Sequence, residues 1–289
     1  MKKLIILIIA SFFLFSVFGV KAAPGATIGA PRSVEELLGV DGKYDAHSVL
    51  LGAAGLEKLE AIAKSLPQIE VKFKVKLSTD ISGTKEEVER EIRQRVTGTV
   101  FGRYLLTVAH VTKIEPPVIQ TSFGPVTLQM EVLEKKFFVS FLGQTYPLKE
   151  VKIDISQDWA LFELPEEAKG KCPAPRVGKS SELKPGHFLY LVGSPYKEGA
   201  ILRSGIVESL SANLEDGSKA ISPEDVFALS GGIYPGDSGG QVFALRDGQL
   251  ELVGMMVVTK LYTTIGYALK VEPLLEKVKA ATGIDLRKQ

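Results

Sequence analysis

Cysteine is almost absent from this sequence, since Cys172 is the only one among 289 residues. An intrachain disulfide is therefore impossible, and the fold must rest on its apolar core. Cys172 lies far in sequence from any of the three histidines. That isolation favours a structural thiol over a catalytic one, and neither a metal site nor a cofactor is expected.

An excess of charge of either sign is also missing, because 35 lysines and arginines stand against 34 aspartates and glutamates. The charges are mixed along the chain and form none of the basic stripes that a phosphate backbone requires. Nucleic acid is thus not an expected partner, and the charges are those of an ordinary solvated surface.

The one long apolar run lies at the N-terminus, from residue 4 to residue 20, behind two lysines. Val20-Lys21-Ala22 then places small residues where a signal peptidase reads them, so residues 1–22 are predicted to be a signal peptide cleaved after Ala22. The mature protein would be periplasmic or secreted, with a net charge of about −2 in place of +1. The run is nearly long enough to cross a bilayer, so a retained membrane anchor is the alternative.

Residues 23–96 are predicted to be an accessory segment, mixed but largely helical. Leu56, Leu59 and Ile62 recur at helical spacing, and Pro67 ends the pattern. The role of this segment is open, because nothing in its pattern selects among oligomer formation, gating of a site and binding of a partner.

The rest of the accessory segment predicts a strand followed by a second helix. Apolar and charged residues alternate over 69–77, which is the period of a half-buried strand. Thr84 and Glu87 then fit a capping box at a helix start. The apolar face of that helix would consist of Val88, Ile92 and Val96.

After Thr97 the pattern changes to short strands separated by turn residues, which is typical of an all-β protein. The predicted strands cover 104–108, 126–132, 136–141, 151–155, 159–164, 188–192, 205–210, 241–244, 250–258 and 266–269. Their number favours two six-stranded antiparallel β-barrels in a mainly β fold, one over residues 97–170 and one over 171–289. A closing helix is expected over 273–281, with Gly283 as its terminator.

Three residues have the types that together activate a serine. Ser238 lies in Gly236-Asp237-Ser238-Gly239-Gly240, His110 follows Ala109, and Asp158 begins Asp158-Trp159-Ala160-Leu161. A serine hydroxyl is a weak nucleophile until an imidazole accepts its proton and a carboxylate orients that imidazole. His110 would be the base, Asp158 the orienting group and Ser238 the nucleophile.

The order of these residues selects among the folds that carry such a triad. Chymotrypsin-like enzymes run His, Asp, Ser, whereas subtilisins run Asp, His, Ser and α/β-hydrolases run Ser, acid, His. The glycine-rich run also fits the nucleophile elbow G-x-S-x-G, which requires a histidine after the serine. The remaining histidines, His47 and His187, both precede Ser238, so the elbow is excluded; His187 is expected to be structural.

Several motifs in this order resemble the trypsin-like (chymotrypsin-fold) serine peptidases, and the bacterial HtrA/Deg type most. They are Leu105-Leu106-Thr107-Val108-Ala109-His110, Asp158-Trp159-Ala160-Leu161-Phe162, Gly205-Ile206-Val207, Pro235-Gly236-Asp237-Ser238-Gly239-Gly240 and Gly266-Tyr267-Ala268-Leu269. The resemblance covers roughly residues 97–283. It implies an exported serine endopeptidase, a hydrolase that forms an acyl-enzyme with peptide or protein substrates.

Two departures from the HtrA pattern are visible. The chain ends soon after the closing helix, so no PDZ domain is expected. HtrA-type enzymes usually carry Asn before the serine, whereas this sequence has Asp237. In trypsin the equivalent carboxylate pairs with a newly cut N-terminus, but no activation cleavage site is evident here, so Asp237 is interpreted as structural, with an unknown partner.

The resemblance also implies an oxyanion hole and a specificity pocket. The backbone N–H groups of Gly236 and Ser238 would stabilise the oxyanion. Gly232 would lie at the base of the primary pocket, with Val257, Val258 and Thr259 as the strand that pairs with substrate. Small or apolar side chains should be preferred at the cleaved position. The alternative is a catalytically silent protease fold that serves as a binding or scaffolding module; the oligomeric state is open.

Overall fold

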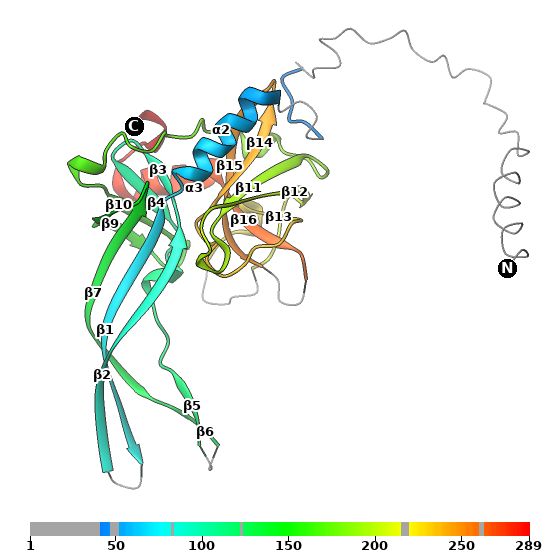
Figure 1. Cartoon of the computed structure of the whole chain (residues 1–289). Coiled ribbons are helices and arrows are strands. Elements are labelled where there is room, and N and C mark those ends of the chain that lie inside the picture. The colour runs from blue at the N-terminus through cyan, green and yellow to red at the C-terminus, as the bar shows by residue number, and fades with distance from the viewer. Residues whose placement is uncertain (1–40, 47–51, 82–83, 122–123, 215–219, 260–262) are drawn as a thin grey trace, which may run out of the picture. The chain divides into compact units, whose positions relative to one another are not determined.

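The computed structural model describes residues 41–46, 52–81, 84–121, 124–214, 220–259 and 263–289. The predicted signal peptide lies outside these residues. The described chain is mainly β, with two α-helices, α2 (Gly52–Lys64) and α3 (Val271–Thr282) (Figure 1). Within it, no helix has the length and apolar character needed to cross a membrane.

The accessory segment begins as the sequence predicts. Helix α2 is followed by Pro67, which cannot continue a helix, and then by strand β1 (Gln68–Ile81). Leu59 of α2 is fully buried, and Ile69, Phe73 and Val75 are buried on one face of β1. A helix and a strand thus lie where the first two elements are expected, but the prediction that the segment is largely helical is not confirmed.

The second predicted helix is wrong, because Thr84–Thr97 forms strand β2, antiparallel to β1. Residues four apart share a face in a helix, but they also share a face in a strand, where side chains alternate. The register places Val88 opposite Leu77 and Ile92 opposite Phe73. The apolar spacing was therefore compatible with both structures, and pairing with β1 decided between them.

The first half of the structure contains two four-stranded sheets and a separate ribbon. The strand order is β2-β1-β7-β8 in one sheet and β3-β4-β10-β9 in the other, and the ribbon pairs β5 with β6. Their bounds are β3 (Thr99–Phe101), β4 (Tyr104–Thr107), β5 (Val118–Thr121), β6 (Gly124–Thr127), β7 (Gln129–Phe141), β8 (Gln144–Pro147), β9 (Lys149–Asp154) and β10 (Trp159–Glu163). Among the described residues this half is not closed by hydrogen bonds as the expected first barrel would be, although a two-barrel fold remains consistent with it.

Some strand limits also differ from the prediction. Strand β7 runs without interruption through 129–141, where two shorter strands are expected from the sequence. Strands β3, β5, β8 and β13 are not predicted at all; each has three or four residues, too few for a period of two to stand out.

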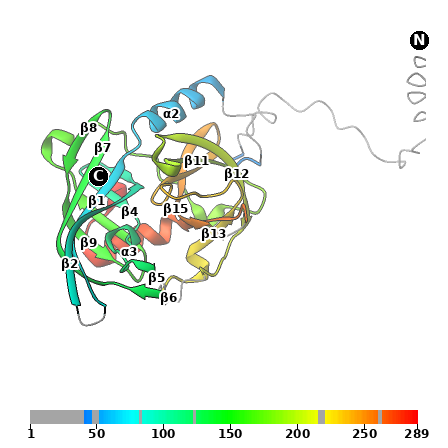
Figure 2. The same cartoon turned by 60° about the horizontal axis from the view of Figure 1, so that its bottom comes forward.

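The second half forms a closed six-stranded barrel, as predicted, and its strands follow the order β11-β12-β13-β16-β15-β14 (Figure 2). Its strands are β11 (Phe188–Gly193), β12 (Ile201–Ser209), β13 (Val226–Leu229), β14 (Gln241–Arg246), β15 (Gln249–Thr259) and β16 (Gly266–Lys270). Helix α3 follows β16 directly and ends at Gly283, whose φ of 74° is left-handed. The predicted closing helix and its terminator are confirmed.

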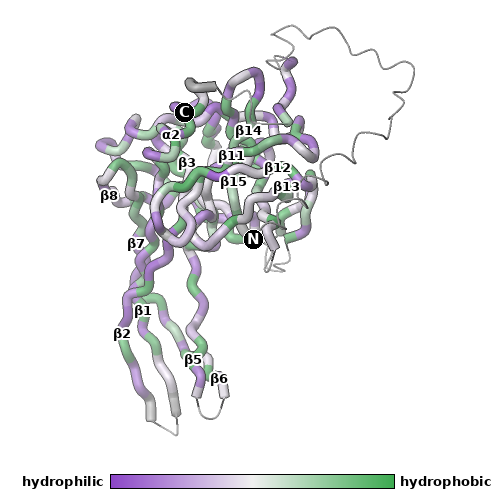
Figure 3. Tube along the Cα trace, turned by 45° about the vertical axis from the view of Figure 1, so that its right-hand side comes forward, coloured by the Kyte–Doolittle hydropathy of each residue, from purple (hydrophilic) through white to green (hydrophobic). Residues whose placement is uncertain are grey.

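Strands β1, β2 and β7 of the first half are long, and they extend away from the other strands as a twisted sheet (Figures 1 and 3). Figure 3 shows hydrophilic and apolar residues mixed along it, whereas apolar segments concentrate in the strands of the body. β1 and β2 precede the expected domain boundary at residue 97, yet β1 pairs with β7 of the first half. The C-terminal end of β2 thereby reaches the barrel half, where the Thr97 N–H donates to the Ser238 carbonyl.

Candidate active site

His110 lies at the start of a 3₁₀ turn (His110–Thr112) that follows β4. Thr107 and Ala109 before it are fully buried. The Thr112 hydroxyl donates to the Ala109 carbonyl at 2.8 Å and closes the turn. The buried strand therefore fixes the backbone of His110, while about a third of its side chain stays exposed.

Asp158 lies just before β10 and is completely buried. Its Oδ1 accepts the backbone N–H groups of Ala109 at 3.0 Å and His110 at 2.8 Å. Its Oδ2 lies 3.0 Å from Nδ1 of the His110 ring. One carboxylate thus fixes both the backbone and the ring of the histidine, which favours the tautomer with the proton on Nδ1 and leaves Nε2 free to act as a base.

Ser238 lies between β13 and β14, in the glycine-rich run. Its carbonyl accepts the backbone N–H of Thr97 at 2.9 Å, so the end of β2 helps to hold it. Its hydroxyl donates to the Val257 carbonyl at 2.9 Å. No hydrogen bond joins Ser238 to His110 within the described structure, so the hydroxyl is turned away from the base.

A cleft of about 550 Å³ contains His110, Ser238 and Gly236. Its lining includes residues 93–96 of β2, together with Tyr196 and others. The accessory segment therefore contributes directly to the site. The sequence pattern does not indicate this contribution, because it predicts a helix over residues 84–96.

The loop before Ser238 contains both residues whose backbone N–H groups are expected to form the oxyanion hole, Gly236 and Ser238. Gly236 has a φ of 103°, which an L side chain rarely adopts. Its backbone N–H and that of Ser238 donate to no acceptor in the part of the chain that is described. Two free donors adjacent to a serine nucleophile can receive a developing negative charge.

The expected specificity residues lie on two sides of that loop. Gly232 is buried, and its N–H donates to the Thr264 carbonyl at 3.0 Å. Val257 is buried, and its carbonyl accepts the hydrogen bond from the Ser238 hydroxyl. Val258 and Thr259 continue β15, paired with Tyr267 and Gly266.

Asp237 has a partner that the sequence analysis missed. Its Oδ2 lies 2.5 Å from Nη2 of Arg203 on β12. Burial raises the pKa of Asp237, and the Tyr234 N–H and the Arg203 guanidinium oppose that rise. A signal for Arg203 existed, because Gly205 and Val207 are the buried residues of the same strand and Arg203 shares their parity.

The other two histidines and the cysteine are accounted for separately. His47 lies outside the described residues. His187 accepts the Lys184 N–H at 3.1 Å and packs edge-on against Tyr44, as a structural residue would. Burial raises the pKa of the Cys172 thiol to about 11, which disfavours a thiolate nucleophile.

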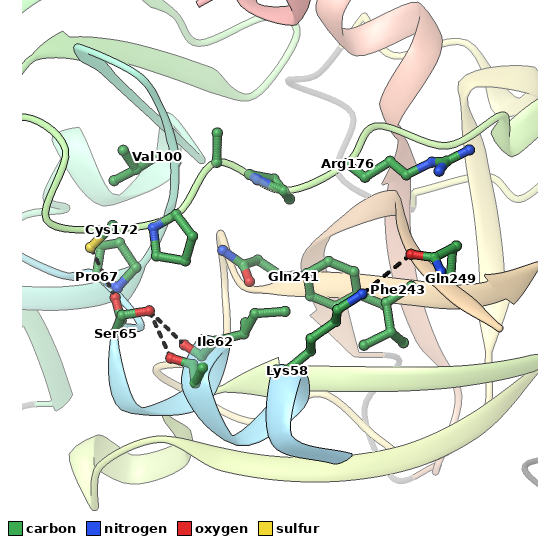
Figure 4. Close-up of a pocket in the computed structure, with 15 residues that line it drawn as sticks. Lys58, Ile62, Ser65, Pro67, Val100, Cys172, Arg176, Gln241, Phe243 and Gln249 are labelled. Atoms are coloured by element: carbon green, nitrogen blue, oxygen red, sulfur yellow. Dashed lines mark hydrogen bonds between the residues drawn. The ribbon is translucent and has the colours of Figure 1, made fainter. Parts of the chain in front are cut away.

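A second cavity, of about 360 Å³, lies away from the triad between α2 and β14 (Figure 4). Apolar and amide side chains line it, among them Ile62, Pro67, Val100, Gln241 and Phe243. Lys58 donates to Gln249 at its edge. His110, Asp158 and Ser238 are not among its lining residues. No group of three or more His, Cys, Asp and Glu residues in the described segments is arranged to hold a metal ion.

Comparisons with known sequences agree with this geometry. A family profile, "Trypsin-like peptidase domain", matches residues 96–255, more than half of the chain. The chain is 32% identical over 117 residues to "Serine protease HTRA1" of Xenopus laevis, covering 40% of this chain and 25% of that protein. It is 35% identical over 107 residues to "Probable periplasmic serine endoprotease DegP-like" of Ectopseudomonas mendocina, covering 37% of this chain and 20% of that protein.

The chain thus spans about a quarter or less of the length of these relatives. Among solved structures, "HtrA-type protease AlgW with decapeptide" superposes with a TM-score of 0.53 at 18% identity. That match covers 77% of this chain and 66% of the other. At this identity the likeness concerns the fold alone.

Proposed function

This chain belongs to the trypsin-like peptidase family, and from that membership we propose that it is an HtrA-type serine endopeptidase that uses His110, Asp158 and Ser238. The observation that carries the proposal is the contact of Asp158 with both the ring and the backbone of His110. Ser238 lies in the same cleft. The HtrA and DegP relatives support the same activity.

The reaction would begin with rotation of the Ser238 hydroxyl from the Val257 carbonyl toward His110. Ser238 Oγ then bonds to the scissile carbonyl carbon while Nε2 of His110 takes its proton. The C–N bond breaks as His110 gives that proton to the leaving amine, and an acyl-enzyme remains. Water, deprotonated by His110, attacks the ester and releases the acid and the free serine.

The negative charge that forms on the carbonyl oxygen would be held by the N–H groups of Gly236 and Ser238. Their lack of other acceptors supports this role. Such donors are already oriented before the reaction, and losing one typically lowers kcat about 10²-fold or more.

A fluorophosphonate probe tests the activity, because only an activated serine displaces its fluoride. We expect an adduct on Ser238, located by mass spectrometry, that Ser238→Ala and His110→Ala abolish. A folded protein that shows no labelling would contradict the proposal and favour the alternative of a silent binding or scaffolding module.

We further propose that the primary pocket accepts small or apolar side chains. Gly232, at the expected base of this pocket, has no charged side chain that could pair with a basic substrate residue. A Cβ at Gly232 would lie 3.1 Å from the Tyr234 hydroxyl, so the space around it is small. Arg203 reaches the Gly232 carbonyl but is paired with Asp237. With peptide anilides that differ only at the cleaved residue, Ala or Val should exceed Arg by about tenfold in kcat/KM; a preference for Arg would contradict this.

Export to the periplasm or beyond is proposed from the N-terminal signal-like sequence and from the periplasmic relative. Peptides or exported proteins would then be the substrates. Amino-terminal sequencing of the protein secreted by its host would test cleavage after Ala22.

A further inference from the structure

The four residues before Ser238 form a turn on which the oxyanion hole depends. The Asp237 N–H donates to the Tyr234 carbonyl at 2.9 Å, with Pro235 and Gly236 between them. Pro at the second position and a positive φ at the third identify a type II turn. In a type I turn the peptide between Pro235 and Gly236 is flipped, so the Gly236 N–H points to the opposite side. Only one of the two turns can offer this N–H to the cleft.

The Asp237 carboxylate is tied to this turn from inside the barrel. It is fully buried, and its Oδ2 accepts the Tyr234 N–H at 2.8 Å. Its Oδ1 has no hydrogen-bond partner among the described residues. A Cβ on Gly193 would lie 2.2 Å from that oxygen, so a glycine in β11 makes the space for it. A buried carboxylate in such a place is costly unless a cation compensates for it.

Arg203 supplies the cation and contacts the loop at three points. Its Nη2 pairs with Asp237 at 2.5 Å, and its Nη1 donates to the Gly232 carbonyl at 3.3 Å. Its guanidinium lies 5.2 Å from the centre of the Tyr234 ring. Only 16% of the Arg203 side chain is exposed, so solvent screens the ion pair little. The planar guanidinium makes these contacts together, which a lysine ammonium cannot reproduce.

We propose that Arg203 is a positioning residue for the oxyanion hole: its pair with Asp237 holds residues 234–237 in the type II turn before substrate arrives. The hole is then formed without cleavage of the chain. This inference rests on the proposed function as a serine endopeptidase. Without Arg203, Asp237 would leave its buried position or take up a proton. Either change would loosen its bond to the Tyr234 N–H and allow the peptide before Gly236 to flip.

Arg203→Gln is the test, read through kcat, KM and the rate of fluorophosphonate labelling of Ser238. We expect kcat and the labelling rate to fall at least about tenfold, a part of what the loss of an oxyanion donor costs, with KM changed less than about threefold. Arg203→Lys should retain more activity than Arg203→Gln. Adding Asp237→Asn to Arg203→Gln should restore part of the loss, because no buried charge is then left unpaired.

Arg103→Gln is the matched control, since Arg103 pairs with Glu163 at the far end of β10 from Asp158. It should label at the wild-type rate. Peptide binding to Ser238→Ala, with and without Arg203→Gln, should be equal by fluorescence anisotropy, which a general loss of structure would not allow.

The outcomes separate the two proposals. A wild-type protein that does not label contradicts the proposed function. A wild-type protein that labels, with Arg203→Gln labelling equally fast, overturns the role of Arg203. If Arg203→Gln does not fold, Arg203→Lys and the double variant Arg203→Gln with Asp237→Asn provide the test. Activity no higher than background in both of these variants would also overturn the role of Arg203.

Discussion

Asp158 shows how much of the site rests on single residues in unusual conformations. It is one of four non-glycine residues with positive φ in the described chain, at 53°. Such a backbone costs free energy that its surroundings must offset, and it often marks a functional position. Here the two backbone N–H groups that Oδ1 accepts offset it. The strained backbone directs a buried carboxylate toward His110.

Cys172 is a single buried residue whose chemical reactivity can be measured. The residue is 7% exposed, and its thiol donates to the Ser65 carbonyl at 3.2 Å. Because burial raises its pKa to about 11, almost no thiolate exists at pH 8, and only the thiolate reacts. We expect iodoacetamide to modify Cys172 at least about tenfold more slowly in the folded protein than in guanidinium. Mass spectrometry over time measures both rates, and equal rates would contradict the burial.

At the scale of elements, the closing helix α3 joins the barrel to the first half. Val271, Leu274, Leu275 and Val278 are its buried face. It ends where Gly283 turns left-handed and donates its N–H to the Lys279 carbonyl at 2.8 Å. The glycine is needed for its backbone and not for space, because a Cβ there would meet nothing within 4 Å.

Gly283→Ala should therefore lower the free energy of unfolding by about 1 kcal/mol, the cost of a left-handed L residue. Gly283→Asn should cost less, since asparagine tolerates this conformation. Guanidinium unfolding of the three proteins measures the difference. An alanine variant as stable as the wild type would mean that the helix ends differently.

At the scale of the molecule, one of the two buried apolar clusters of the described residues runs through both halves, while the other is made largely of barrel residues. The shared cluster includes Phe101 and Trp159 from the first half, Phe243 from the barrel and Leu274 from α3. The proposed catalytic residues are divided in the same way, with His110 and Asp158 before the barrel and Ser238 between its strands β13 and β14. Movement between the halves would therefore disturb both the core and the site.

A shared core predicts that the halves unfold together. Trp159 is the only tryptophan and reports on the first half, whereas far-ultraviolet circular dichroism reports on the whole chain. We expect the two signals to follow one guanidinium transition with the same midpoint. Separate midpoints would show that the halves unfold independently.

The sequence alone was enough to predict the order of the candidate triad, five of the six strands of the second barrel, helix α2 and the closing helix. Local spacing is enough for these, because an apolar period or a short motif lies within one segment. It identified Asp237 as unusual and gave Arg203 the parity of the buried residues of its strand, but no local pattern pairs two residues that lie 34 positions apart.

The tertiary structure was needed for the rest. It made residues 84–97 a strand, because residues four apart share a face in either structure and the partner strand selects one of them. It brought the end of that strand into the cleft beside Ser238. It also showed that the Ser238 hydroxyl donates its hydrogen bond to the Val257 carbonyl and not to His110. Each of these depends on contacts between segments far apart in sequence, which no local pattern records.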